Sequence, residues 1–216
     1  MPVVALAVYA AWLAVTVGLR VWHQRRHTGD TGVRLGDVRR GSAEWWAALL
    51  FFLAVPANPA APLAALAGLA PLRALDRTAV HVAGVVIAVA GLALTSAAQL
   101  SMGEAWRIGV DHAEHVRLVT GGPFRLVRNP IYCAMAVTGA GMALISPNPV
   151  AVAQLAALAA GLHIQVRGVE EPYLRRIHGA AYAQYASRVG RFIPGIGRSR
   201  PETRAATHMP ANDQSG

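Results

Sequence analysis

Five long apolar runs constrain the fold of this chain more than any other feature of its sequence. They cover residues 3–22, 45–70, 79–100, 131–145 and 150–166. A helix that crosses a bilayer needs about 20 mostly apolar residues, and in lipid only helices and closed barrels satisfy all their backbone hydrogen bonds. The runs therefore predict an all-α, polytopic membrane protein with about five transmembrane helices.

The individual runs differ in ways that matter for the layout. The first is too long for the apolar part of a signal peptide and is followed by no small-residue cleavage site, so we expect it to be retained as a span. The second contains Pro56, Pro59 and Pro62, which predict a kinked or broken helix. The last two are short and joined by a four-residue turn at 146–149. They predict a tilted helical hairpin that need not cross the membrane completely.

The placement of arginine predicts the orientation. Charged residues make up only 14% of the chain, yet the net charge is +9 and every basic residue is arginine. Six arginines, counting Arg20, lie between the first two runs, four between the third and fourth, and eight from Arg167 onward, against only Arg73 and Arg77 between the second and third. Because basic loops stay in the cytoplasm, we expect a multi-pass protein of the cell membrane with its N-terminus outside and its C-terminus inside. This asymmetry explains the basic composition without a nucleic-acid partner.

The rest of the chain adds three expectations. The segment 172–188 has apolar residues at three- and four-residue spacing and exposed arginines, which predicts an amphipathic helix on the membrane interface. The tail at 199–216 is polar and predicted to be disordered, so that residues 1–198 form a single domain. Cys133 is the only cysteine, so we expect neither a disulfide framework nor a metal centre.

Small and lone polar residues within the runs indicate helix packing. Small side chains at helical spacing allow close helix contacts in lipid. Isolated polar residues are interpreted in the same way, as packing or interhelical hydrogen bonds rather than as catalytic groups. The small residues are Gly84, Ala88, Gly91 and Thr95 in the third run and Ala136, Gly139, Ala140 and Ala143 in the fourth, and the polar ones are Gln99, His163 and Gln165.

Two polar segments next to the last two runs are candidates for chemistry. Ahead of the fourth run, Asn129 is predicted to be a helix N-cap and Pro130 the first helical residue, and such a helix start offers free N–H groups to a ligand. After the fifth run come Glu170 and Glu171. Adjacent carboxylates at the end of an apolar span need water or a partner. On residue type alone, a solvated helix start is the favoured interpretation.

The order of four motifs resembles the isoprenylcysteine carboxyl methyltransferase family, which belongs with the phospholipid methyltransferases to a wider group of membrane methyltransferases. The resemblance covers residues 103–194. Its motifs are Gly-Pro-Phe-Arg-Leu-Val-Arg-Asn-Pro-Ile-Tyr at 122–132, Glu-Glu-Pro-Tyr-Leu at 170–174, His-Gly-Ala-Ala-Tyr-Ala-Gln-Tyr at 178–185 and Arg-Phe-Ile-Pro at 191–194. The resemblance implies an S-adenosylmethionine-dependent methyltransferase.

The same resemblance implies roles for individual residues. Arg167 would hold the carboxylate of the methyl acceptor and, with Tyr132, would form the catalytic pair. Asn129 stands where the family has histidine, and because an amide does not titrate, no pH-dependent role is expected there. The implied cofactor-binding residues are Val116, Arg117, Leu118, Val119, Phe124, Asn129, Pro130, Ile131, Tyr132 and Glu170.

A carboxylate is the acceptor that these residues favour. It is ionised at neutral pH, so its methylation needs no general base, and arginine matches it with two parallel donors. The expected acceptor is an isoprenoid, another lipid-like molecule or a small carboxylic acid. An amine acceptor is disfavoured because Arg167 would repel an ammonium, while a small thiol and a non-enzymatic protein of the same fold remain alternatives.

Overall fold

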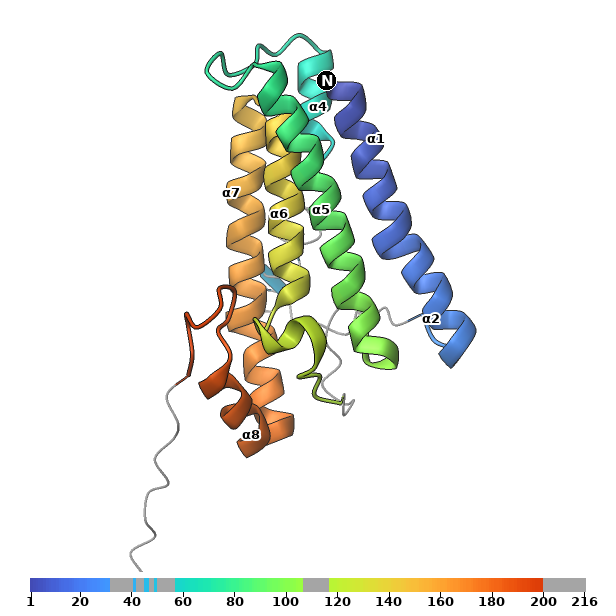
Figure 1. Ribbon diagram of the computed structural model, residues 1–216, viewed down its shortest axis with the longest axis vertical. Helices are drawn as coiled ribbons and strands as arrows, with labels where there is room; N and C mark the ends of the chain where they lie inside the picture. Colours follow the sequence, from blue (N-terminus) through green and yellow to red (C-terminus); the bar gives the residue numbers. More distant parts are fainter. Residues whose placement is uncertain (32–40, 42–44, 47–48, 50–56, 107–116, 200–216) are drawn as a thin grey trace, which may run out of the picture.

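The structure is a computed structural model that describes residues 1–31, 41, 45–46, 49, 57–106 and 117–199. These parts form an upright bundle of helices with a cap of shorter segments at one end (Figure 1). The helices are α1 (Pro2–Leu13), α2 (Arg20–Thr28), α4 (Ala60–Leu66), α5 (Thr78–Met102), α6 (Pro130–Ile145), α7 (Pro149–Ile164) and α8 (Glu171–Arg188). A π-helical turn, η1 (Ala14–Leu19), joins α1 to α2, and two short 3-10 turns are η2 (Gly103–Ala105) and η3 (Gly122–Arg125).

Three of the described helices are long and apolar enough to cross a bilayer. They are Pro2–Thr28 with 27 residues, Thr78–Ala105 with 28 and Pro149–Arg188 with 40. The helix at Pro130–Ile145 is apolar but shorter. The all-α class and four of the five predicted runs are thus confirmed as helices. In the run at 45–70, residues 47–48 and 50–56 lie outside the described residues, and α4 lies in its second half.

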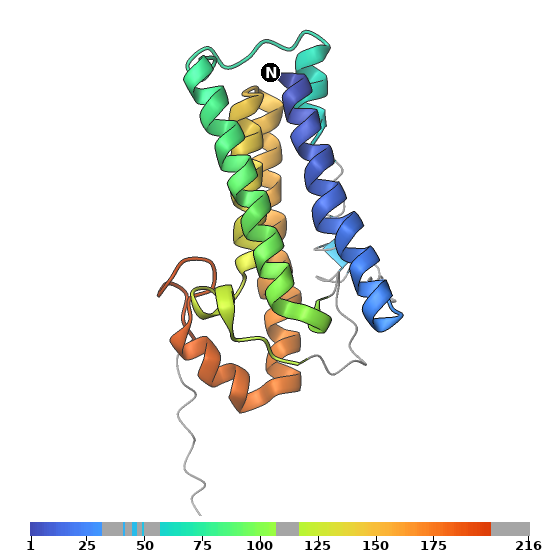
Figure 2. The same ribbon diagram turned by 45° about the vertical axis from the view of Figure 1, so that its right-hand side comes forward.

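The fourth predicted run is a short helix, as expected, but the fifth belongs to a much longer helix, which corrects the prediction that both final helices are short. A second π-helical turn, η4 (Gln165–Glu170), links α7 to α8, so the helix passes through Glu170 and Glu171 instead of beginning there. Pro172 has no backbone N–H to donate to an α-helical hydrogen bond. The π turn, whose hydrogen-bond pattern differs from that of an α-helix, lies just before this proline. The helix bends only at Gly179, where φ is 47° and ψ is −121°. The second part of α8 then turns away from the line of α7 (Figure 2).

Helices α5 and α6 pack against each other through small residues, as predicted for the third run. Side by side in both views (Figures 1 and 2), they approach so closely that a Cβ atom added to Gly84 would lie 2.8 Å from the carbonyl oxygen of Gly141. On α6, Gly139 packs instead against Leu158 of α7, where a Cβ would lie 2.7 Å from a leucine methyl. Small residues therefore fix α6 between two neighbours.

Substituting Gly141 with alanine should lower the melting temperature of the protein in detergent. The new Cβ would lie 2.4 Å from the backbone nitrogen of Ala88, and overpacking of this kind costs about 1–3 kcal/mol. Gly18→Ala is the matched control, because its nearest neighbour would be a carbonyl oxygen at 3.9 Å. Equal melting temperatures for the two variants would contradict this account of the α5–α6 contact.

The loops gather at two ends of the bundle. The N-terminus, the α4–α5 connection and the α6–α7 turn share one end (Figure 1), and the backbone N–H of Leu72 donates to the carbonyl of Pro147 there over 2.7 Å. The end of α2, the end of α5, η3 and α8 share the other end. Successive loops thus alternate between the two ends of the bundle, as the arginine pattern requires. The N-outside orientation itself stays a prediction.

Candidate active site

A tyrosine–glutamate contact joins the start of α6 to the π turn. The hydroxyl of Tyr132 donates to Oε1 of Glu170, and the side-chain amide of Gln165 donates to the same oxygen over 3.4 Å. In a π-helix the residues five apart are hydrogen-bonded neighbours, so η4 brings Gln165 and Glu170 together. The Glu170 carboxylate consequently faces α6 at the cap end of the bundle.

Glu170 retains capacity for a further ligand. It is half-buried, and both of its described donors use Oε1. Within the described ranges no arginine contacts it, and its Oε2 accepts no hydrogen bond. A carboxylate in this setting can take a cation or a hydroxyl donor with a charge-assisted hydrogen bond.

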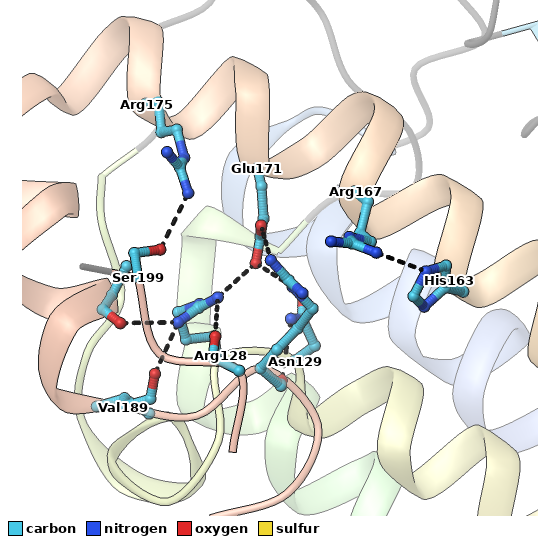
Figure 3. Close-up of polar contacts among 11 residues, drawn as sticks. Arg128, Asn129, His163, Arg167, Glu171, Arg175, Val189 and Ser199 are labelled. Atoms are coloured by element: carbon cyan, nitrogen blue, oxygen red, sulfur yellow. Dashed lines mark hydrogen bonds and ion pairs between the residues drawn. The ribbon is translucent and has the colours of Figure 1, made fainter. Parts of the chain in front are cut away.

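Glu171, in contrast, is fully engaged in an ion-pair cluster, which we call the Glu171 clasp and which consists of Arg128, Glu171 and Arg191. Arg191 binds both carboxylate oxygens, through Nε and Nη2 at 2.7 Å each, and Arg128 binds Oε1 at 2.6 Å. The carboxylate raises the pKa of the Arg191 guanidinium by accepting these hydrogen bonds. Glu171 is only 5% exposed and is expected to hold structure rather than ligand (Figure 3).

The clasp also fastens the C-terminal segment onto the start of α6. The Arg128 guanidinium donates to the carbonyls of Ala186, Val189 and Gly197 at 2.9, 2.7 and 3.1 Å. The backbone N–H of Arg128 donates to the carbonyl of Gly190 over 2.8 Å. A single buried guanidinium thus organises the chain from the end of α8 to residue 197.

Asn129 and Pro130 begin α6 as predicted, but the Asn129 side chain does not cap the helix. Its Nδ2 donates instead to the carbonyl of Arg191 over 3.1 Å. Of the predicted cofactor-binding residues Asn129 and Tyr132, the described structure thus brings only Tyr132 into contact with Glu170. Pro130 is buried at the first helical position, and Ile131 is half-buried beside it.

The predicted cofactor strip lies just ahead of α6. Val116 lies outside the described residues. Arg117 is exposed, and Leu118 and Val119 are half-buried. Phe124, in η3, is buried, and its carbonyl accepts a hydrogen bond from the hydroxyl of Tyr185 at 2.6 Å. This bond ties the strip to α8, and the cofactor role of the strip stays a prediction.

Arg167 lies three residues before Glu170 but outside the Tyr132–Glu170 contact. It is exposed, and its Nη1 lies 3.3 Å from Nε2 of His163 (Figure 3). Within the described residues it contacts neither Tyr132 nor Glu170. The structure therefore groups Tyr132 with Glu170 and leaves Arg167 with His163.

The sequence did not predict several polar contacts at this end of the bundle. The motifs contained Arg128 and Arg191, but no pattern indicated that both bind Glu171. Gln165 was predicted to serve in packing or in an interhelical hydrogen bond, whereas its amide donates to Glu170 five residues further along the same helix. Gln99, interpreted in the same way, does form the interhelical bond expected of it, to the carbonyl of Thr16 over 3.0 Å.

Comparisons with known proteins point to one group of membrane enzymes. The family described as phospholipid methyltransferase matches residues 79–181. Protein-S-isoprenylcysteine O-methyltransferases A and B of Arabidopsis thaliana are 29% and 26% identical over 115 residues, which is 52% of this chain and 58% of each relative. The match thus spans somewhat more than half the length of these curated relatives.

A solved structure shows the same fold. It is the eukaryotic intramembrane Ras methyltransferase, an isoprenylcysteine carboxyl methyltransferase, with a TM-score of 0.57 and 19% identity over 93% of this chain and 70% of that one. The chain is thus similar in sequence to phospholipid and isoprenylcysteine methyltransferases and shares the fold of an integral, multi-pass membrane protein.

Proposed function

We propose that the protein is an S-adenosylmethionine-dependent membrane methyltransferase that esterifies the carboxylate of an isoprenoid or other lipid-like acceptor. The observation that carries the proposal is the Glu170 carboxylate, which faces Tyr132 at the start of α6 and whose Oε2 accepts no hydrogen bond from the described residues. Similarity to the phospholipid methyltransferase family supports the reaction type. The names of the Arabidopsis relatives support the acceptor class.

The residues at this end suit the cofactor chemically. S-adenosylmethionine carries an ammonium and two ribose hydroxyls, which are donors that Oε2 of Glu170 can accept. Tyr132 orients the carboxylate, and Leu118, Val119 and Phe124 supply an apolar wall. When bound, the cofactor supplies a methyl group on a sulfonium, and its transfer to a carboxylate oxygen leaves a neutral thioether with no proton to remove.

The acceptor is assigned to Arg167. Its exposed guanidinium can hold a carboxylate with two parallel hydrogen bonds, and an exposed position on a membrane helix is open to a lipid-like molecule that arrives sideways. A carboxylate needs alignment and exclusion of water rather than a base. We place this end of the bundle on the cytoplasmic side, where the arginines gather.

The description of the matching family favours one rival, methylation of a phospholipid amine. An ammonium would have to lose a proton and would be repelled by Arg167. A small thiol would also have to ionise, because its ordinary pKa is about 8.5. These rivals give products that differ in chemical lability, so one assay separates them from the proposed reaction.

Radiolabelled methyl transfer by the purified protein tests the proposal and the role of Arg167 together. With N-acetyl-S-farnesylcysteine as the acceptor, the product should release its label in mild base, as a methyl ester does. Arg167→Ala should lower kcat/KM for this acid about ten- to hundredfold, the equivalent of one charged hydrogen bond of about 1.5–3 kcal/mol. Arg167→Lys should recover only part of the loss, because lysine lacks the planar fork.

Arg188→Ala, which removes another exposed arginine, is the matched control and should behave as wild type. Base-stable label on phosphatidylethanolamine or farnesylamine would replace the carboxylate proposal with amine methylation. Full activity of Arg167→Ala on the acid would remove Arg167 from the acceptor site.

A further inference from the structure

His163 contacts the guanidinium of Arg167 on the same membrane helix. The two residues are four apart on the helix formed by α7 and η4, and both are exposed. Side chains at this spacing lie one above the other, and Nη1 of Arg167 lies 3.3 Å from Nε2 of His163. The guanidinium therefore reaches back toward α7 (Figure 3).

This direction leads into the membrane. Helix α7 begins at Pro149, at the opposite end of the bundle. At 1.5 Å per residue, His163 lies about 21 Å and Arg167 about 27 Å along the helix, within a hydrocarbon core of about 30 Å. Arginines near the end of a span usually extend toward water, so a guanidinium turned toward His163 lies deeper than is usual.

The ring of His163 in turn lies near Phe192, the residue that follows Arg191 of the Glu171 clasp. The His163 ring lies 6.4 Å from the ring of Phe192, measured between centroids. Phe192 follows Arg191, which is bound to both oxygens of Glu171, and its carbonyl accepts a hydrogen bond from Sγ of Cys133 at 3.1 Å. The C-terminal segment thus supports one side of the His163 ring.

We propose, on the basis of the proposed function, that His163 is a positioning residue. It keeps the Arg167 guanidinium at the depth of the acceptor carboxylate. In the tautomer with hydrogen on Nδ1, the imidazole accepts one N–H through Nε2 and leaves the other guanidinium donors for the ligand. A carboxylate attached to an isoprenoid or acyl chain meets this cation without leaving the apolar region. An amine attached to the same chain gains nothing there, so the pair selects for anionic acceptors.

The test is binding of N-acetyl-S-farnesylcysteine to protein saturated with S-adenosylhomocysteine, measured by calorimetry in detergent. His163→Leu should weaken this binding about tenfold, because leucine fills the space but offers no acceptor. His163→Gln should restore it to within about threefold, because the glutamine oxygen can accept the same N–H. S-adenosylhomocysteine affinity should stay the same in all variants, and His27→Leu, which removes another exposed histidine, should bind as wild type.

Two further results separate this inference from the proposed function. In an Arg167→Ala background, His163→Leu should cause no additional loss, because a positioning residue acts through the group that it positions. Equal acid binding by His163→Leu and wild type, or an equal loss in His163→Leu and His163→Gln, would overturn the role of His163 while leaving acid binding intact. Wild-type protein that binds S-adenosylhomocysteine but not the acid would overturn both the proposed acceptor class and this inference.

Discussion

Glu171→Gln is expected to cost the protein about 3–5 kcal/mol of stability, which is the usual effect of removing one partner from a buried ion pair. The carboxylate is 5% exposed and so is Arg128. Glutamine keeps the shape of the side chain but removes the charge that balances two guanidiniums. It also presents N–H donors to Arg128 and Arg191, which are themselves only donors.

The measurement is unfolding of the purified protein in detergent, followed by circular dichroism. Glu170→Gln is the matched control, because the same change one residue earlier breaks no described ion pair. Its melting temperature should stay near that of wild type, whereas that of Glu171→Gln should fall well below. Similar curves for the two variants would mean that the clasp does not stabilise the fold.

The sequence predicted the membrane helices because they depend on local composition. The apolar runs at 79–100 and 131–145 correspond closely to α5 and α6, and the close contact of Gly84 with Gly141 follows from the small size of glycine. The prediction failed at 167–172, where charge and a proline suggested a new helix. A π turn continues the helix instead, and such a turn has no recognisable residue pattern of its own.

The candidate site was predicted only in part. Tyr132 and Glu170 were named from the family motifs, and the structure brings them into contact. The assignment of Glu171 to a helix start in water was wrong, because its partners Arg128 and Arg191 lie 43 and 20 residues away in sequence. Pairing at such distances is decided by the tertiary fold, which places the C-terminal segment over the start of α6.

Glu170→Gln should weaken S-adenosylmethionine binding about ten- to hundredfold, the equivalent of about 1.5–3 kcal/mol for one hydrogen bond to a charged group. Glutamine can still accept from Tyr132, so the site should keep its shape. It loses the negative charge that would attract the ammonium of the cofactor. Because the Glu171 carboxylate is occupied by arginines, Glu171→Gln should reduce affinity much less, when measured below its melting temperature.

Calorimetric titration of S-adenosylmethionine into the wild-type protein and the Glu170→Gln variant tests the central claim most directly. The account predicts one binding site per chain in wild type and an affinity at least tenfold lower in Glu170→Gln. Wild-type protein without binding would indicate a non-enzymatic member of the family, and equal affinities would show that the Tyr132–Glu170 contact is not the cofactor site.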